Sequence, residues 1–216
     1  MSLAVHDLPL FLMAALLVNL TPGPDMLFVA SSSAVHGRRA GVLAAFGVGA
    51  GCLLHLALAA VGLSALLAAS ATAFSVVKWV GAAYLVWVGI SMLRARADVL
   101  AGSEPASVVP MQGSSRVFWQ GAWTNALNPK VALFFLAFLP QFIVPGAPQQ
   151  ALSFLALGLV FTVGGVLVNI GVALLTHRVR QGLSSRSGSA RFGVWLQRAA
   201  GALFVGLGLK LAFSAR

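Results

Sequence analysis

Long stretches of this chain carry no charged side chain. No Asp, Glu, Lys or Arg occurs from Ala40 to Val77, and none occurs from Gln150 to Thr176. Only 8% of all residues are charged, whereas a soluble domain carries about 25%. So few charges cannot cover the surface of a water-soluble globule, and the apolar content excludes a disordered chain. The pattern predicts an all-α polytopic membrane protein whose surface faces lipid.

Six segments are long and apolar enough to cross a bilayer, which takes about 20 residues. In chain order they are Leu8–Ala30, Ala40–Ala68, Ala73–Leu93, Val117–Pro140, Gln150–Thr176 and Gly193–Phe213. The last segment must place Arg198 and Lys210 near the membrane interfaces. The longer connections are too short to be soluble domains, so we expect one transmembrane domain over residues 1–216.

Basic residues are distributed unevenly among the expected loops. Most lie on one side of the membrane: Arg38, Arg39, Arg94, Arg96, Arg116, Arg178, Arg180, Arg186, Arg191 and Arg198. The opposite side holds Lys78 and Arg216. Because basic residues gather in cytoplasmic loops, both termini are expected to be periplasmic. The same bias accounts for the net charge of +10 without a nucleic-acid partner, which would need a basic domain exposed to water.

The two halves of the chain resemble each other. At a fixed offset, Lys78–Arg96 aligns with Arg198–Arg216 and pairs Gly81 with Gly201. The second and fifth spans each carry a glycine followed four residues later by a polar group, and proline interrupts the first and fourth. These similarities predict two three-helix repeats, residues 8–93 and 117–213, joined by a cytoplasmic loop at 94–116. Since three is odd, the second repeat must be inverted, as in many secondary transporters.

The two interruptions are the most informative local features. The first reads Thr21-Pro22-Gly23-Pro24-Asp25 and the second Asn128-Pro129-Lys130. Proline lacks a backbone donor and clashes with the preceding helical turn. A break survives in lipid only where protein or water satisfies the freed groups. Two interpretations remain: kinks that shape the bundle, or half-helices whose N-termini point free N–H groups at a substrate carboxylate.

Asp25 and Lys130 stand beside these interruptions, where an ionised side chain is costly. Three interpretations are open: a structural ion pair between them, a position near an interface, or contact with a zwitterionic substrate. In the last case, Asp25 meets an ammonium and Lys130 a carboxylate, with Asn125 and Asn128 adding donors and acceptors.

His55 lies on the same face of its span as Gly47 and Gly51, whose GxxxG spacing permits close helix contact. A structural hydrogen bond and a proton relay both fit this histidine. The sequence contains neither a metal-binding motif nor a catalytic one, and Cys52 is alone. We therefore expect no cofactor, no metal and no enzymatic activity.

Taken together, these motifs resemble the LysE/RhtB family of amino-acid exporters. The resemblance rests on Leu20–Asp25, on the glycines from Gly41 to Gly51 with His55, on Gly81–Leu85, on Asn128–Lys130 and on Leu139–Phe142. It implies a bacterial inner-membrane exporter of amino acids or close derivatives, driven by proton antiport. It is closer to the branch that exports homoserine, homoserine lactone, threonine and similar neutral amino acids.

The two interruptions and the polar groups beside them supply the candidate site residues. The expected substrate-binding residues are Thr21, Pro22, Gly23, Pro24, Asp25, Asn125, Asn128, Pro129 and Lys130. Asp25 is the first candidate for proton coupling and His55 the second, because a substrate ammonium and a proton would compete for one carboxylate. The expected partners are the amino acid, protons, the lipid bilayer and, in a homo-oligomer, further copies of the chain. A membrane scaffold or a membrane-embedded enzyme is the competing interpretation.

Overall fold

The computed structural model describes residues 4–69, 113–144 and 146–182, together with isolated positions between 79 and 94 and between 198 and 209. Apart from one isolated β-bridge between Val5 and Ile143, the regular structure of these residues is entirely helical. The expected spans at 73–93 and 193–213 lie outside the described residues except at those isolated positions.

Helix boundaries follow the prolines and glycines of the sequence. Helix α1 (Leu8–Leu20) and helix α2 (Pro24–His36) are separated by three residues, and their axes differ by 50°. Gly37, with φ of 86°, makes the tight turn into helix α3 (Arg38–Ala69). A left-handed backbone of this kind favours glycine because a side chain would clash with the carbonyl.

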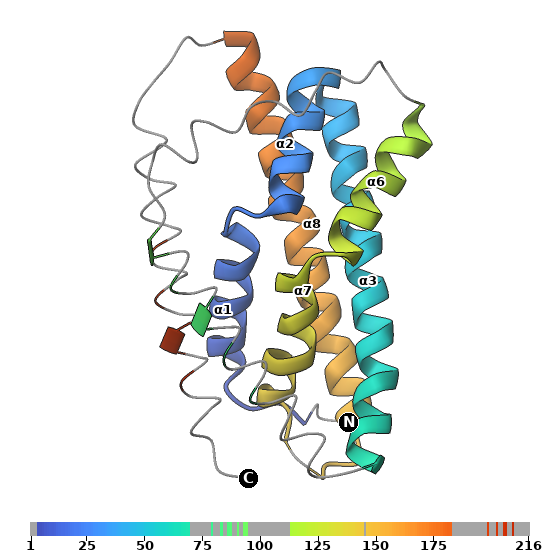
Figure 1. The fold of residues 1–216 in the computed structure, drawn as a ribbon, viewed down its shortest axis with the longest axis vertical. Coiled ribbons are helices and arrows are strands. Elements are labelled where there is room, and N and C mark those ends of the chain that lie inside the picture. Colours follow the sequence, from blue (N-terminus) through green and yellow to red (C-terminus); the bar gives the residue numbers. More distant parts are fainter. Residues whose placement is uncertain are drawn as a thin grey trace.

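The second half begins with helix α6 (Ser114–Ala126) and helix α7 (Pro129–Leu133). Helix α7 continues as a π-helical stretch, Phe134–Phe138, and a 3-10 turn, Leu139–Phe142. Helix α8 (Gln150–Gly182) then runs the length of the molecule beside α3 (Figure 1). Figure 1 also shows the α1–α2 and α6–α7 junctions at similar heights, near the middle of the long axis.

Two helices of the described part are long and apolar enough to cross a membrane. They span Arg38–Val61 and Gln150–Arg178, and the bent α1–α2 pair makes a third if it is one span. These spans fit the expected membrane protein. The expected fourth span is instead divided between α6, which is comparatively polar, and the apolar helix Pro129–Phe142.

Glycines allow that close approach between α3 and α6. A Cβ atom at Gly47 would overlap the carbonyl oxygen of Phe118, and one at Gly51 would overlap that of Ala122. From the other side, a Cβ at Gly121 would come within 2.6 Å of the carbonyl oxygen of Ala44. The backbones therefore touch directly, as the GxxxG spacing predicts.

Replacing Gly47 by alanine is expected to destabilise the protein by about 1–3 kcal/mol, because the new methyl group has no space. The matched control is Gly171→Ala on α8, where a Cβ atom meets nothing within 4 Å. Thermal unfolding of both variants in detergent measures the difference. Equal melting temperatures for the two variants would contradict the close contact.

The cores at the two ends of the molecule differ in side-chain size. Toward the end that holds the N-terminus, phenylalanines from α1, the π-helical stretch, the 3-10 turn and α8 pack together, and the rings of Phe134 and Phe161 stack with centroids 3.9 Å apart. Toward the other end the buried cluster contains small side chains: Val29, Ala44, Ala45, Val48, Val117 and Ala173. The candidate site lies between these clusters.

Candidate functional site

The interruption between α1 and α2 places a carboxylate inside the protein. Thr21 closes α1 by donating from its hydroxyl to the carbonyl of Leu17 at 2.7 Å. Gly23 is extended and precedes the first turn of α2, which contains Pro24 and Asp25. The residue Asp25 is only 7% exposed. A carboxylate in the first turn of a helix interacts favourably with the positive end of the helix dipole.

The interruption between α6 and α7 contributes two buried amides. Asn125 lies in the last turn of α6 and Asn128 precedes α7; they are 2% and 3% exposed. The Asn128 carbonyl oxygen caps α7 by accepting from the backbone N–H of Lys130 at 3.0 Å. Capping of this kind satisfies one of the free donors at a helix start.

Both amides hold the carboxylate of Asp25. Asn125 Nδ2 and Asn128 Nδ2 each donate to Asp25 Oδ2 at 2.9 Å. The other carboxylate oxygen, Oδ1, is buried and accepts no hydrogen bond from the part of the chain that the structure describes. An unpartnered buried acceptor is costly and requires a physical reason. Asp25 is thus fixed through one oxygen and has the other available for a donor.

Lys130, which follows the second interruption, is held by backbone carbonyls at the α1–α2 interruption. Its ammonium donates to the carbonyls of Val18 at 3.4 Å and Thr21 at 3.3 Å, at the C-terminal end of α1. Cations are favourable at this negative end of a helix. A Cβ atom at Gly23 would come within 3.2 Å of Nζ, so glycine leaves room for the ammonium.

Asp25 and Lys130, both in the described part of the chain, do not form an ion pair. Their charged atoms lie beyond the 4.0 Å limit for one. Asp25 is instead held by the α6–α7 interruption, which carries Lys130. Lys130 is held at the α1–α2 interruption, which carries Asp25. An ammonium has three donors, and two of those of Lys130 are used.

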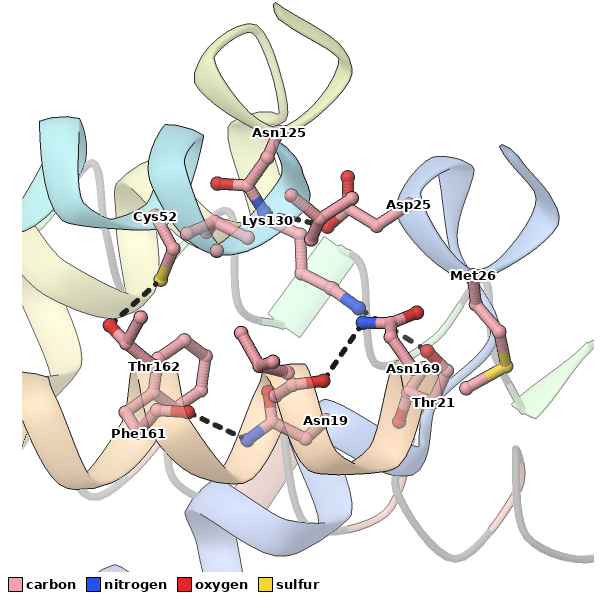
Figure 2. Close-up of a pocket in the computed structure, with 15 residues that line it drawn as sticks. Asn19, Thr21, Asp25, Met26, Cys52, Asn125, Lys130, Phe161, Thr162 and Asn169 are labelled. Atoms are coloured by element: carbon pink, nitrogen blue, oxygen red, sulfur yellow. Dashed lines mark hydrogen bonds between the residues drawn. The ribbon is translucent and has the colours of Figure 1, made fainter. Parts of the chain in front are cut away.

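A small cavity of about 30 Å³ lies among these residues (Figure 2). Its walls come from α1, α2, α3, α6, α7 and α8, and include Asn19, Thr21, Asp25, Met26, Val48, Gly49, Cys52, Asn125, Lys130, Val131, Phe161, Thr162, Gly165, Val166 and Asn169. Such a volume holds roughly two water molecules, so the cavity is too small for an amino acid in this conformation.

The expected site residues divide into three groups by position. Thr21, Asp25, Asn125 and Lys130 line the cavity. Asn128 donates a hydrogen bond to Asp25 but does not line the cavity. The remaining expected residues build the backbone of the two interruptions: Pro22, Gly23, Pro24 and Pro129.

His55 supports the site from outside the cavity. Its Nε2–H donates to the backbone carbonyl of Asn125 at 2.9 Å, and its ring stacks on Phe135 with centroids 6.5 Å apart. The histidine therefore helps to position the amide that holds Asp25. This contact fits the structural hydrogen bond, which the sequence left open beside a proton relay.

Sequence reasoning missed Asn19, which lines the cavity from α1. Its Nδ2 donates to the carbonyl of Phe161 at 3.1 Å, and Gly165 fits closely against its side chain. An amide in an otherwise apolar helix was the available signal. Asn169 of α8 also lines the cavity and leaves its Oδ1 without a partner. Within the described residues, no group of three His, Cys, Asp or Glu side chains is placed to hold a metal ion.

A family model described as a LysE type translocator matches residues 16–215. The chain belongs to the LysE family. The match covers both interruptions and all of the cavity-lining residues, and it confirms the resemblance read from the motifs.

Related proteins support the same assignment. A homoserine/homoserine lactone efflux protein of Salmonella typhimurium is 34% identical over 94% of each chain. An uncharacterised membrane protein of Pseudomonas aeruginosa is 35% identical over 98% of this chain and 97% of its own. A leucine efflux protein of Klebsiella pneumoniae is 32% identical over 94% of this chain and 92% of its own. No solved structure matches this LysE-family chain. The Salmonella and Klebsiella relatives are both named as efflux proteins.

Proposed function

We propose that this protein exports neutral amino acids or their close derivatives across the bacterial inner membrane in exchange for protons. Family membership and the efflux activities named for the relatives support export of such compounds. The observation that carries the assignment to this site is the buried, unpartnered Oδ1 of Asp25 beside a cavity that Lys130 also lines.

The two charged groups suit a zwitterion. In the proposed complex, Asp25 Oδ1 accepts from the substrate ammonium while Oδ2 keeps its bonds to Asn125 and Asn128. The third N–H of Lys130 donates to the substrate carboxylate. Both contacts are charge-assisted hydrogen bonds, which are stronger than neutral ones. Thr21, Pro22, Gly23, Pro24 and Pro129 complete the proposed site by shaping the backbone around these groups.

Proton coupling follows from competition for one oxygen. A proton on Asp25 Oδ1 and a substrate ammonium both supply the donor that this oxygen lacks, and both cannot occupy it at once. Release of substrate on one side would therefore favour protonation there. His55, which holds Asn125, is the second candidate for this coupling.

The transport cycle requires the cavity to open. About 30 Å³ accommodates water but no amino acid, so the helices around the cavity must move apart on one side at a time. We propose that residues 8–93 and 117–213 act as inverted repeats of a single transmembrane domain, with the two interruptions as the hinges of this movement.

The proposed orientation places the Arg-rich end in the cytoplasm and both termini in the periplasm. In a Cys52→Ser background, Pro148→Cys is expected to react with an impermeant thiol reagent added to intact spheroplasts, and Ser115→Cys is not. Both residues are exposed: Ser115 lies in the first turn of α6 and Pro148 just precedes α8. These two helices begin at opposite ends of the molecule (Figure 1). Reaction of Ser115→Cys from outside would reverse the orientation.

Ligand binding to the purified protein tests the proposed function directly. Homoserine, homoserine lactone, threonine and leucine are added to the full chain in detergent, with glutamate and lysine as charged comparisons. A ligand at one hundred times its Kd stabilises a folded protein by about 2.7 kcal/mol. For a chain of this size, that raises the melting temperature by roughly 5–10 °C. A scaffold would show no shift with any of these compounds, and that result would contradict the proposal.

A further inference from the structure

A second, larger hollow lies at the Arg-rich end of the molecule, away from the central cavity. It measures about 1020 Å³ and lies where α2 passes into α3, where α6 begins and against α8, at the upper end of Figure 1. We call it the basic groove; its lining residues are His36, Arg38, Arg39, Ala40, Val42, Leu43, Phe46, Gly113, Ser114, Val117 and Leu174. None of these residues lines the central cavity.

The mouth of the basic groove is positively charged. Arg38 and Arg39 open α3 with exposed side chains, and His36 ends α2 beside them. In the described part of the chain neither arginine has an ion-pair partner. The helix starts at Arg38 and Ser114 add partial positive charge from their free N–H groups. An anion placed here would meet several donors and no carboxylate of the described residues.

The walls below the mouth are apolar and open. Phe46 is 51% exposed and Leu174 is 42% exposed, with Val42 and Leu43 half-buried between them. From Arg38 to Phe46 the helix rises about 12 Å. One leaflet of the hydrocarbon core is about 15 Å deep. Because Arg38 begins a helix that is long and apolar enough to cross a membrane, this rise takes the groove from headgroup depth into the acyl-chain region.

We propose that the basic groove binds one anionic phospholipid of the cytoplasmic leaflet. The lipid phosphate contacts the guanidinium groups of Arg38 and Arg39, and an acyl chain lies along Phe46 and Leu174. Arginine matches phosphate with paired donors, and the apolar walls match a hydrocarbon chain. The charge of the mouth selects phosphatidylglycerol over zwitterionic phosphatidylcholine. The choice of leaflet rests on the orientation proposed above, whereas lipid binding itself does not depend on the transport activity of the central site.

Lipid titration followed by native mass spectrometry tests the proposal on the full-length protein in detergent. Dioleoyl phosphatidylglycerol is expected to bind at least about tenfold more tightly than dioleoyl phosphatidylcholine, since each basic residue contributes roughly fivefold. The double variant Arg38→Gln/Arg39→Gln is expected to lose roughly 25-fold in affinity for phosphatidylglycerol and little for phosphatidylcholine. The matched control is Arg116→Gln, which removes an exposed arginine on α6 outside the groove.

One further substitution and one competition experiment distinguish a bound lipid from a free anion. Ala40→Trp keeps every charge but fills the groove, and it is expected to abolish tight phosphatidylglycerol binding. Inorganic phosphate at millimolar concentration is expected not to displace the lipid; full displacement would reveal a site for free anions and overturn the proposal. An equal loss in Arg116→Gln and in the double variant would overturn it as well. Circular dichroism checks that each variant keeps its helical content. If the double variant fails to fold, the single variant Arg39→Gln takes its place.

Discussion

Substitution of Asp25 by asparagine is expected to abolish gradient-driven accumulation of substrate in proteoliposomes. Asparagine can keep both hydrogen bonds from Asn125 and Asn128 by placing its carbonyl oxygen where Oδ2 lies. It cannot exchange a proton, and it removes the negative charge from the proposed ammonium contact. A hydrogen bond to a charged group contributes about 1.5–3 kcal/mol, so substrate binding should weaken by roughly 10- to 150-fold.

The matched control for this variant is Asp7→Asn. Asp7 stands at the start of α1 with its side chain 57% exposed, next to His6. The control should accumulate substrate as the wild type does, while Asp25→Asn keeps its helical content and its melting temperature. If Asp25→Asn retained accumulation with a normal dependence on pH, the coupling group would lie elsewhere and His55 would be tested next.

Substitution of Lys130 by glutamine is expected to discriminate between substrates with and without a carboxylate. Homoserine should bind at least roughly tenfold more weakly to the variant, because the proposed contact to its carboxylate is lost. Homoserine lactone has no free carboxylate and should lose about threefold or less on the same reasoning. Isothermal titration of both ligands to wild-type and variant protein provides the comparison.

The same variant also tests a structural role of Lys130. The shorter glutamine side chain should leave the carbonyls of Val18 and Thr21 without their donor, which costs about 1 kcal/mol of stability. A lower melting temperature with equal losses for homoserine and its lactone would show that Lys130 only joins α7 to α1. A selective loss for homoserine supports the carboxylate contact even if stability falls as well.

Some of this architecture follows from the sequence because local chemistry dictates it. Proline lacks an N–H donor and fits the first turn of a helix, so helix starts could be placed at Pro24 and Pro129. Charge-free segments predicted the long apolar helices α3 and α8. The spacing of Gly47 and Gly51 predicted a close helix contact, which the structure forms with α6.

Other features could not be predicted because they depend on tertiary packing. Asp25 and Lys130 stand beside the two interruptions, which allowed an ion pair between them. Instead, Asp25 accepts hydrogen bonds from two amides of the opposite interruption, and Lys130 donates to two carbonyls at the end of α1. Which amide donates to which oxygen depends on how α2 and α6 meet, and no local pattern encodes that. The contact between Asn19 and the carbonyl of Phe161 could not be predicted for the same reason, since the two residues are far apart in the chain.

Proton movement driven by substrate is the most direct test of exchange at Asp25. Proteoliposomes containing a pH-sensitive dye are loaded with homoserine or leucine and diluted into substrate-free buffer without an imposed pH gradient. The account predicts that substrate efflux drives protons inward and acidifies the lumen with wild-type protein, and that Asp25→Asn gives no acidification. Substrate efflux from wild-type vesicles without any pH change, or equal acidification with Asp25→Asn, would contradict it.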